Sequence, residues 1–223
     1  MSEPLVNVLE PALNVGLISL DDAKILLDIP SGDTSQDEKL QMLIDQSSMT
    51  LAAEANRETF AKEKVIERWD CVEPVCCPDG TCKIYLMRWP VKPADIVRVE
   101  TPEGTLVDPS GYRLEQHTGK LVLIGGCSGE IIVEYTGGYM LPDEAPLPLR
   151  QALGLRMRQL RSQEAQQATG GSGIRMLAHR ESRIMYFSPK DMAGGGSTTG
   201  GISVSAADIA VKNLISKYTR YWI

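Results

Sequence analysis

The sequence has few histidines and phenylalanines and no long apolar run. Its 223 residues include only two His and two Phe, so acid–base groups near neutral pH are scarce and Leu, Ile, Val and Met must form most of the core. It contains no run of about 18 apolar residues, so we expect no membrane-spanning helix. The first residues, MSEPLVNVLEPALNVGLI, lack a basic stretch and contain two prolines, which argues against a signal peptide. We therefore expect a protein that is made, and stays soluble, in a cytoplasm.

The cysteines are odd in number and irregularly spaced, so a disulfide framework is not expected. Four of them lie in the stretch CVEPVCCPDGTC, whose gaps differ from the paired C-x2-C spacing of zinc sites. The PDG within it predicts a hairpin tip at Pro78, Asp79 and Gly80. Free thiols are the favoured interpretation, with a zinc site or a Cys77–Cys82 cross-strand disulfide as the alternatives. The five are Cys71, Cys76, Cys77, Cys82 and Cys127.

Charge is distributed unevenly along the chain. The net charge is −6 overall, but residues 1–144 carry 25 acidic and 12 basic side chains whereas residues 145–223 carry 4 acidic and 11 basic. One interpretation is chance, with charges spread over solvated faces. The other is a molecule with one acidic and one basic region, as expected of a part that stacks between different neighbours.

Hydrophobic periodicity predicts an α+β fold. Apolar residues recur at helical spacing over residues 19–29, 36–57 and 147–163, and Ser19 is placed to cap the first of these helices. Small residues in the second helix allow close helix–helix contact. Between them, residues 62–137 alternate as short strands separated by PDG, PEG, DPSG and HTG turns, which predicts a series of antiparallel hairpins. The expected architecture is a helical core with this β region inserted.

The C-terminal part combines glycine runs with an amphipathic helix. Residues 164–201 predict a flexible, basic and glycine-rich loop; its GGGSTTGG has Gly201 where a phosphate-binding loop needs Lys. Residues 202–223 follow as an extended arm that ends in a helix with one apolar stripe. That stripe packs either on a partner, which we favour, or back on its own domain.

No motif for catalysis is present. His117 lies in a predicted hairpin turn and His179 in the basic loop, and neither adjoins a nucleophile motif such as G-x-S-x-G. We therefore expect a protein that is not an enzyme and that needs no cofactor or metal. The arginines of residues 150–183 leave open a DNA-binding or packaging-associated role, although the acidic chain lacks a recognised DNA-reading motif.

Three segments, taken in order, resemble the head–tail connector (adaptor, or head-completion) proteins of long-tailed bacteriophages. IYLMRWPVKPADIVRVE, residues 84–100, is similar to the LYLRRWPV signature of that family. Residues 131–163 are similar to its next block, a strand, a Y-T-x-G-Y motif, a proline-containing loop and a helix. Residues 17–57 match its short helix, break and long helix. The resemblance spans about residues 16–163.

The resemblance implies a structural virion protein at the neck, the head–tail interface, assembled in the host cytoplasm. Such adaptors form a ring, usually of twelve copies, beneath the portal protein. The ring extends the DNA channel, binds a tail-proximal neck protein (a stopper or tail terminator) and lets packaged DNA pass without sequence-specific binding. No membrane is involved.

This interpretation divides the chain into an adaptor core (1–163), the flexible loop (164–201) and a C-terminal docking arm (202–223). The expected contact residues fall in the last two parts. The arm residues expected to bind the portal are Ile202, Val204, Val211, Leu214, Tyr218, Tyr221 and Trp222, and the loop residues expected to contact ring neighbours or partners are Arg175, Arg180, Arg183, Tyr186 and Phe187.

Overall fold

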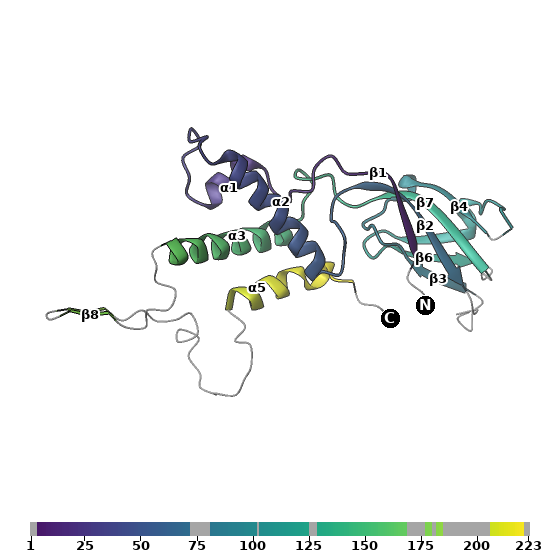
Figure 1. Cartoon of the computed structure of the whole chain (residues 1–223). Coiled ribbons are helices and arrows are strands. Elements are labelled where there is room, and N and C mark those ends of the chain that lie inside the picture. Colours follow the sequence, from purple (N-terminus) through teal and green to yellow (C-terminus); the bar gives the residue numbers. More distant parts are fainter. Residues whose placement is uncertain are drawn as a thin grey trace, which may run out of the picture. The chain divides into compact units, whose positions relative to one another are not determined.

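A computed structural model describes residues 4–71, 81–101, 103–124, 129–168, 177–179, 182–184 and 206–220 (Figure 1). The chain forms two compact units, and each is built from separate stretches of sequence. The first, the β unit, comprises residues 1–16 and 57–145. The second, the helical unit, comprises residues 17–56 and 146–223. The predicted α+β class is confirmed, with helices and antiparallel sheets in one chain.

The predicted helices form, within a few residues of their expected ends. The hydroxyl of Ser19 accepts a hydrogen bond from the Asp22 amide at 3.2 Å and so caps the first helix, as its sequence indicates. The last helix runs into a short 3-10 turn, η3 (Ser216–Tyr218). The helices are α1 (Leu20–Leu26), α2 (Asp37–Glu54), α3 (Leu147–Ala168) and α5 (Ala206–Ile215).

The helical unit has a shared apolar core. Helix α3 packs against α2 and α5, and α1 packs against α2 (Figure 1). Two small residues of α2 lie inside this unit: Ser47 and Ser48 are buried, and the Ser48 hydroxyl accepts the Leu17 amide at 3.1 Å. The buried apolar residues include Ile44, Leu51, Ala52, Leu149, Leu153, Met157, Val211 and Ile215.

The β unit holds two antiparallel sheets and two 3-10 turns, η1 (Pro93–Asp95) and η2 (Pro109–Gly111). One sheet has the order β1-β2-β7-β4 and the other has the order β3-β6-β5. Six of the strands lie where the sequence predicts them. The strands are β1 (Leu5–Glu10), β2 (Glu63–Cys71), β3 (Thr81–Tyr85), β4 (Ile96–Glu100), β5 (Tyr112–Glu115), β6 (Lys120–Ile124) and β7 (Gly129–Gly137).

The pairing of these strands differs from the predicted series of hairpins. Strand β2 pairs along its whole length with β7, from Glu63 opposite Gly137 to Cys71 opposite Gly129, although four other strands, β3 to β6, lie between them in sequence. Within the described part of the β unit, β5 and β6 are the paired strands that a short turn joins, and this turn contains His117 as predicted. Strand β1, which the sequence did not predict, pairs with β2 at the edge of the sheet. Turn residues fix local chain reversal and carry no information on such distant partners.

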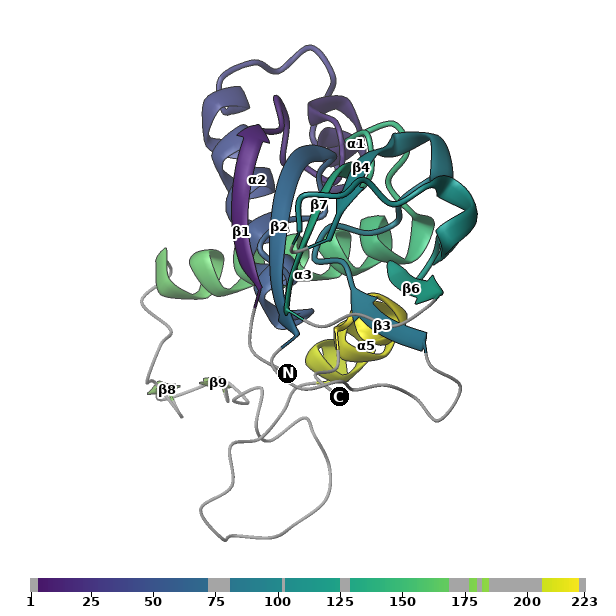
Figure 2. The same ribbon diagram turned by 90° about the vertical axis from the view of Figure 1, so that its right-hand side faces the viewer.

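Within the predicted loop, two further strands form a separate antiparallel pair, β8 (Leu177–His179) and β9 (Ser182–Ile184) (Figure 2). Helix α3 also continues to Ala168, five residues beyond its predicted end. Within the described ranges no helix combines the length and hydropathy that crossing a bilayer requires.

Candidate interaction surfaces

The RWPV segment, which resembles the connector signature, contributes buried residues to the core of the β unit. The Arg88 side chain is almost fully buried, and its Nε donates to Glu63 Oε2 at 2.9 Å while its Nη2 donates to Glu58. Burial disfavours the charge on Arg88, but the hydrogen bonds that Arg88 donates to the carboxylates of Glu58 and Glu63 outweigh this effect, so the pKa of Arg88 rises above its usual value. The Arg57 guanidinium stacks on the Trp89 ring, 4.2 Å from its centroid.

The tyrosine of the Y-T-x-G-Y motif joins a buried hydrogen-bond network. The Tyr135 hydroxyl donates to Glu67 and accepts the Arg88 amide at 2.8 Å. The Glu67 carboxylate also accepts the Met87 amide at 2.7 Å and the Trp69 indole N–H at 3.1 Å. Burial first, and then the charge of Glu67, raise the pKa of Tyr135 well above 10. The network therefore fixes β2, β7 and the segment after β3 to one another.

The two glycines of the motif are required by close backbone approach. A Cβ on Gly137 would lie 2.1 Å from the carbonyl oxygen of Arg88, and one on Gly138 would lie 2.2 Å from the carbonyl oxygen of Ala61. Gly138 also has a φ of +108°, which side chains rarely tolerate. The signature residues thus hold the β unit together.

The arginines of α3 are engaged inside the helical unit. Arg150 forms an ion pair with Asp22, and Arg156 forms ion pairs with Glu54 and with Asp208, the latter at 2.8 Å. These contacts join α3 to α1, α2 and α5.

The next two α3 arginines hydrogen-bond to the C-terminal end of α1. Arg158 Nε donates to the Leu26 carbonyl at 3.0 Å, and Arg161 Nη1 donates to the Leu27 carbonyl at 2.7 Å. Cations at this position satisfy carbonyls that the helix leaves unbonded. The helical unit carries 12 acidic and 13 basic side chains and the β unit carries 17 and 10, so the acidic excess lies in the β unit and the helical unit is nearly neutral.

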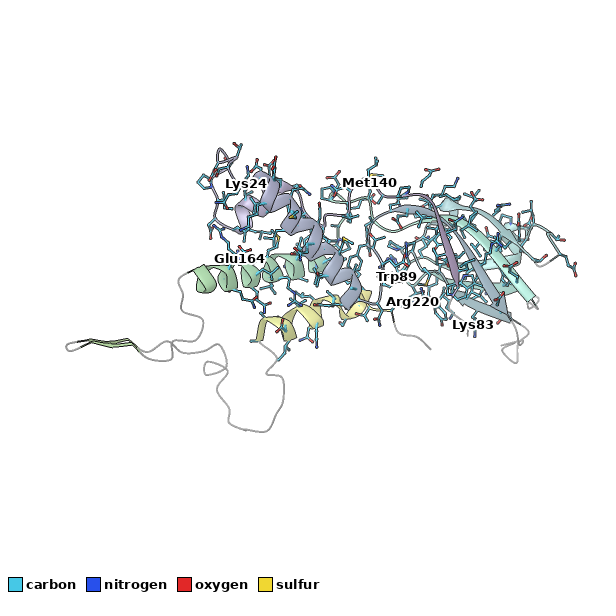
Figure 3. The ribbon with its side chains drawn as sticks, in the orientation of Figure 1. Lys24, Lys83, Trp89, Met140, Glu164 and Arg220 are labelled. Carbon is cyan, nitrogen blue, oxygen red and sulfur yellow. The ribbon has the colours of Figure 1, made fainter. Side chains whose placement is uncertain are left out.

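The apolar stripe of α5 packs on its own chain. Val211 is 0% exposed and Ile215 is buried, whereas Leu214 and Tyr218 are half-buried. The end of the segment is anchored to α2: the Arg220 amide donates to the Ala55 carbonyl at 2.9 Å (Figure 3). Val211 therefore packs in the interior of the helical unit. Periodicity in the sequence identifies such an apolar stripe but does not show which surface covers it. The portal contact expected of the arm stays a prediction.

Most other predicted contact residues lie outside the described residues. Arg183 is in β9, where it pairs with Ala178 of β8. The residues that the structure does not describe are the hairpin-tip residues Pro78, Asp79 and Gly80, the loop residues Arg175, Arg180, Tyr186 and Phe187, and the arm residues Ile202, Val204, Tyr221 and Trp222.

The cysteine interpretation needs one correction. Cys82 is disulfide-bonded, so it is not the free thiol that the sequence favours. Within the part of the chain that the structure describes, no group of three or more His, Cys, Asp or Glu side chains is arranged to hold a metal ion.

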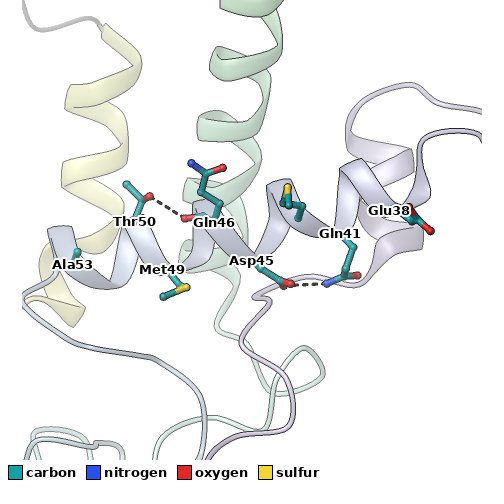
Figure 4. A pocket seen from close by; sticks show the side chains of 8 residues that line it. Glu38, Gln41, Asp45, Gln46, Met49, Thr50 and Ala53 are labelled. Carbon is teal, nitrogen blue, oxygen red and sulfur yellow. Dashed lines mark hydrogen bonds between the residues drawn. The ribbon is translucent and has the colours of Figure 1, made fainter.

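A surface that the sequence analysis did not identify runs along α2, opposite its buried side. We call it the outer face of α2 (Figure 4); it borders an open hollow of about 940 Å³. Met42 and Met49 are 72% and 59% exposed on it. Their spacing of seven residues was the available sequence signal. The residues of this face are Glu38, Gln41, Met42, Asp45, Gln46, Met49, Thr50 and Ala53.

Comparison with known proteins shows what fold this is. No protein-family model and no curated protein sequence matches the chain. Solved structures do. One is a chain in the neck of an empty gene transfer agent (GTA) particle, computed with C6 symmetry; it has a TM-score of 0.53 and 12% identity, over 98% of this chain and 97% of that chain. Another, in the virion of a native GTA particle, has a TM-score of 0.51 and 14% identity over the same shares of the two chains. The fold of these particle components is therefore shared over nearly the full length.

Proposed function

We propose that the chain is a structural component of the neck of a phage-like particle, where it acts as the head–tail adaptor. The observation that carries this proposal is the fold shared, over nearly all of both chains, with a chain from a GTA neck. The sequence resemblance to head–tail connectors of long-tailed bacteriophages supports the same role from individual motifs. Those motifs serve core packing, as Arg88 and Tyr135 illustrate, which fits a protein with a structural and non-enzymatic task.

In this role, copies of the chain form a ring beneath the portal that continues the DNA channel and joins the capsid to the tail. The family resemblance implies about twelve copies and a stopper or tail terminator as the tail-proximal partner. Packaged DNA passes through without sequence-specific binding. The helical unit supports this last point, because its α3 arginines are already bonded to Asp22, Asp208 and neighbouring backbone carbonyls and are not presented as a basic face.

The arm contributes to portal binding through the side chains that its own unit leaves accessible. Leu214 and Tyr218 are half-buried, and Tyr221 and Trp222 follow them in the sequence. Val211 supports this contact indirectly, by holding α5 on the helical unit. The arm is thus a helix that stays with its own subunit while its last residues contact the portal.

Particles produced without this chain test the proposal. We expect DNA-filled or leaking heads and separate, unjoined tails in electron micrographs, and joined particles again when the wild-type chain is supplied. Cryo-electron microscopy of the restored particles should then show its density between portal and tail. Joined particles in the absence of the chain, or density elsewhere in the particle, would contradict the proposal.

A further inference from the structure

The outer face of α2 makes this helix apolar on two sides. Its buried side carries Leu40, Ile44 and Leu51, while Met42 and Met49 project from the opposite side and are largely exposed. A surface helix with a single partner shows one apolar stripe and a polar opposite face. Methionine side chains adapt readily to the shape of a partner, and they recur on protein-binding surfaces. The second stripe therefore indicates a second contact that this helix makes.

The same face carries acidic groups that stand apart from the ion pairs of the helical unit. Asp22, Glu54 and Asp208 are paired with α3 arginines, but Glu38 and Asp45 form no ion pair with any residue that the structure describes. Among the described residues, Asp45 accepts a side-chain hydrogen bond from the Gln41 amide group, at 3.0 Å. The face is thus apolar and acidic along about 22 Å of helix, and a partner that is apolar and basic would complement it.

The chain itself contains a segment of that composition. Residues 174–187 read IRMLAHRESRIMYF and carry three arginines against one glutamate, together with Met, Leu, Ile, Tyr and Phe. Among the described residues, strands β8 and β9, of three residues each, form a two-stranded sheet of their own. An isolated two-stranded hairpin is at best marginally stable in water, so a surface that receives it supplies the missing packing.

We propose that the outer face of α2 binds residues 174–187 of a second copy of this chain. The choice of a second copy rests on the proposed ring, because a head-to-tail ring needs two different, complementary surfaces on every subunit. The segment and the face are such a pair. Arg175, Arg180 and Arg183 lie against the acidic positions of the face, and the apolar side chains of the segment cover its methionines.

A peptide of residues 172–189 tests this contact on the full chain, at a concentration where the chain sediments as a monomer. We expect the peptide to bind the wild-type chain and a variant with Arg175, Arg180 and Arg183 changed to Gln equally well. In isotope-edited NMR, we expect the contacts between the labelled peptide and the chain to involve residues of α2. A face variant, Met42→Lys with Asp45→Lys, should bind about tenfold more weakly or not at all. Ile25→Lys with Asp21→Lys, an equal charge change on exposed residues of α1, should leave binding unchanged.

The alternatives give different results. If the segment covers α2 of its own chain, the peptide binds the arginine variant and not the wild type, which overturns the second-copy assignment. If the peptide binds neither the wild-type chain nor the arginine variant, or if it binds the face variant as tightly as the wild type, then the outer face of α2 is not the binding surface for this segment. Peptide binding to α2 combined with particle density outside the neck would contradict the proposed function and leave this contact standing.

Discussion

The Arg156 guanidinium lies 2.8 Å from the carboxylate of Asp208 and so connects the middle of α3 to the first turn of α5. The same side chain also pairs with Glu54 at the end of α2. One cation therefore joins three helices that come from distant parts of the sequence. The basic character of α3, which in sequence suggests an outward-facing patch, serves the interior contacts of the helical unit instead.

Replacing Arg156 by Met should loosen α5. The change keeps the length of the side chain but leaves two carboxylates without their cation, and we expect a loss of about 1–3 kcal/mol in the free energy of unfolding. Denaturant unfolding measures this loss, and hydrogen exchange should rise first in residues 206–220. Lys212→Met is the control, because Lys212 is exposed on α5 and forms no ion pair with a described residue. Equal effects of the two substitutions would contradict the bridging role of Arg156.

A pair of aspartate substitutions tests how α5 is oriented. Val211 is 0% exposed and Ile209 is 53% exposed on the same helix. Val211→Asp places a charge in the apolar core and should lower the free energy of unfolding by about 3 kcal/mol or more, whereas Ile209→Asp should change it by less than about 0.5 kcal/mol. Thermal unfolding distinguishes the two. Similar small effects would mean that α5 does not pack on α3 in solution.

The arm prediction concerns residues beyond the helix. Tyr221→Ala with Trp222→Ala should reduce the binding of the purified portal while the melting temperature stays unchanged, because the buried residues Val211 and Ile215 are kept. Lys217→Ala, on an exposed position of η3, serves as the control. A pull-down with portal measures the binding. Full portal binding by the double variant would remove Tyr221 and Trp222 from the portal contact.

Alkaline pH should destabilise the β unit through Tyr135. Its pKa in the folded chain lies well above 10, so the folded state keeps the phenol proton while the unfolded state loses it near pH 10. The free energy of unfolding should therefore be unaffected below that pH and fall as pH rises above it. Tyr135→Phe should be less stable at neutral pH, by about 1–2 kcal/mol through lost hydrogen bonds, but should show a shallower alkaline decline. Tyr85→Phe, at a half-buried position, is the comparison; an unaltered decline in Tyr135→Phe would contradict the assignment.

DNA binding separates the adaptor from the DNA-binding alternative. Because Arg150, Arg156, Arg158 and Arg161 are engaged in the fold, we expect weak binding to duplex DNA, without sequence preference, at about 150 mM salt. Fluorescence anisotropy over a range of salt concentrations gives the affinity and its slope. Tight binding with a steep salt dependence, lost when Arg175, Arg180 and Arg183 become Gln, would instead support the alternative role.

Local features of the fold were predictable from sequence, and distant contacts were not. The Ser19 cap, the helix breaks and the strand positions from Glu63 to Gly137 follow from spacing and turn residues, which act over a few positions. Strand β1 was missed because Pro4 and Pro11 flank a stretch whose residues are mostly exposed and show no buried alternation.

The pairing of β2 with β7 depends on which buried faces match, and no local pattern specifies that. The candidate surfaces show the same limit. The stripe of α5 was recognised, but its partner, α3, became evident only in three dimensions. The outer face of α2 was overlooked because its methionines lie opposite the stronger stripe that contains Ile44 and Leu51.

The interleaved sequence of the two units has a consequence for synthesis on the ribosome. Residues 17–56 leave the ribosome long before α3 and α5, which complete the same unit. Strand β1 likewise leaves the ribosome well before β2, the strand with which it pairs. A chain cut short before residue 206 lacks α5, which packs on α3 and contributes the buried residues Val211 and Ile215. Such a chain therefore has an incomplete helical unit. The helical unit can therefore close only after residues 206–220 have been made.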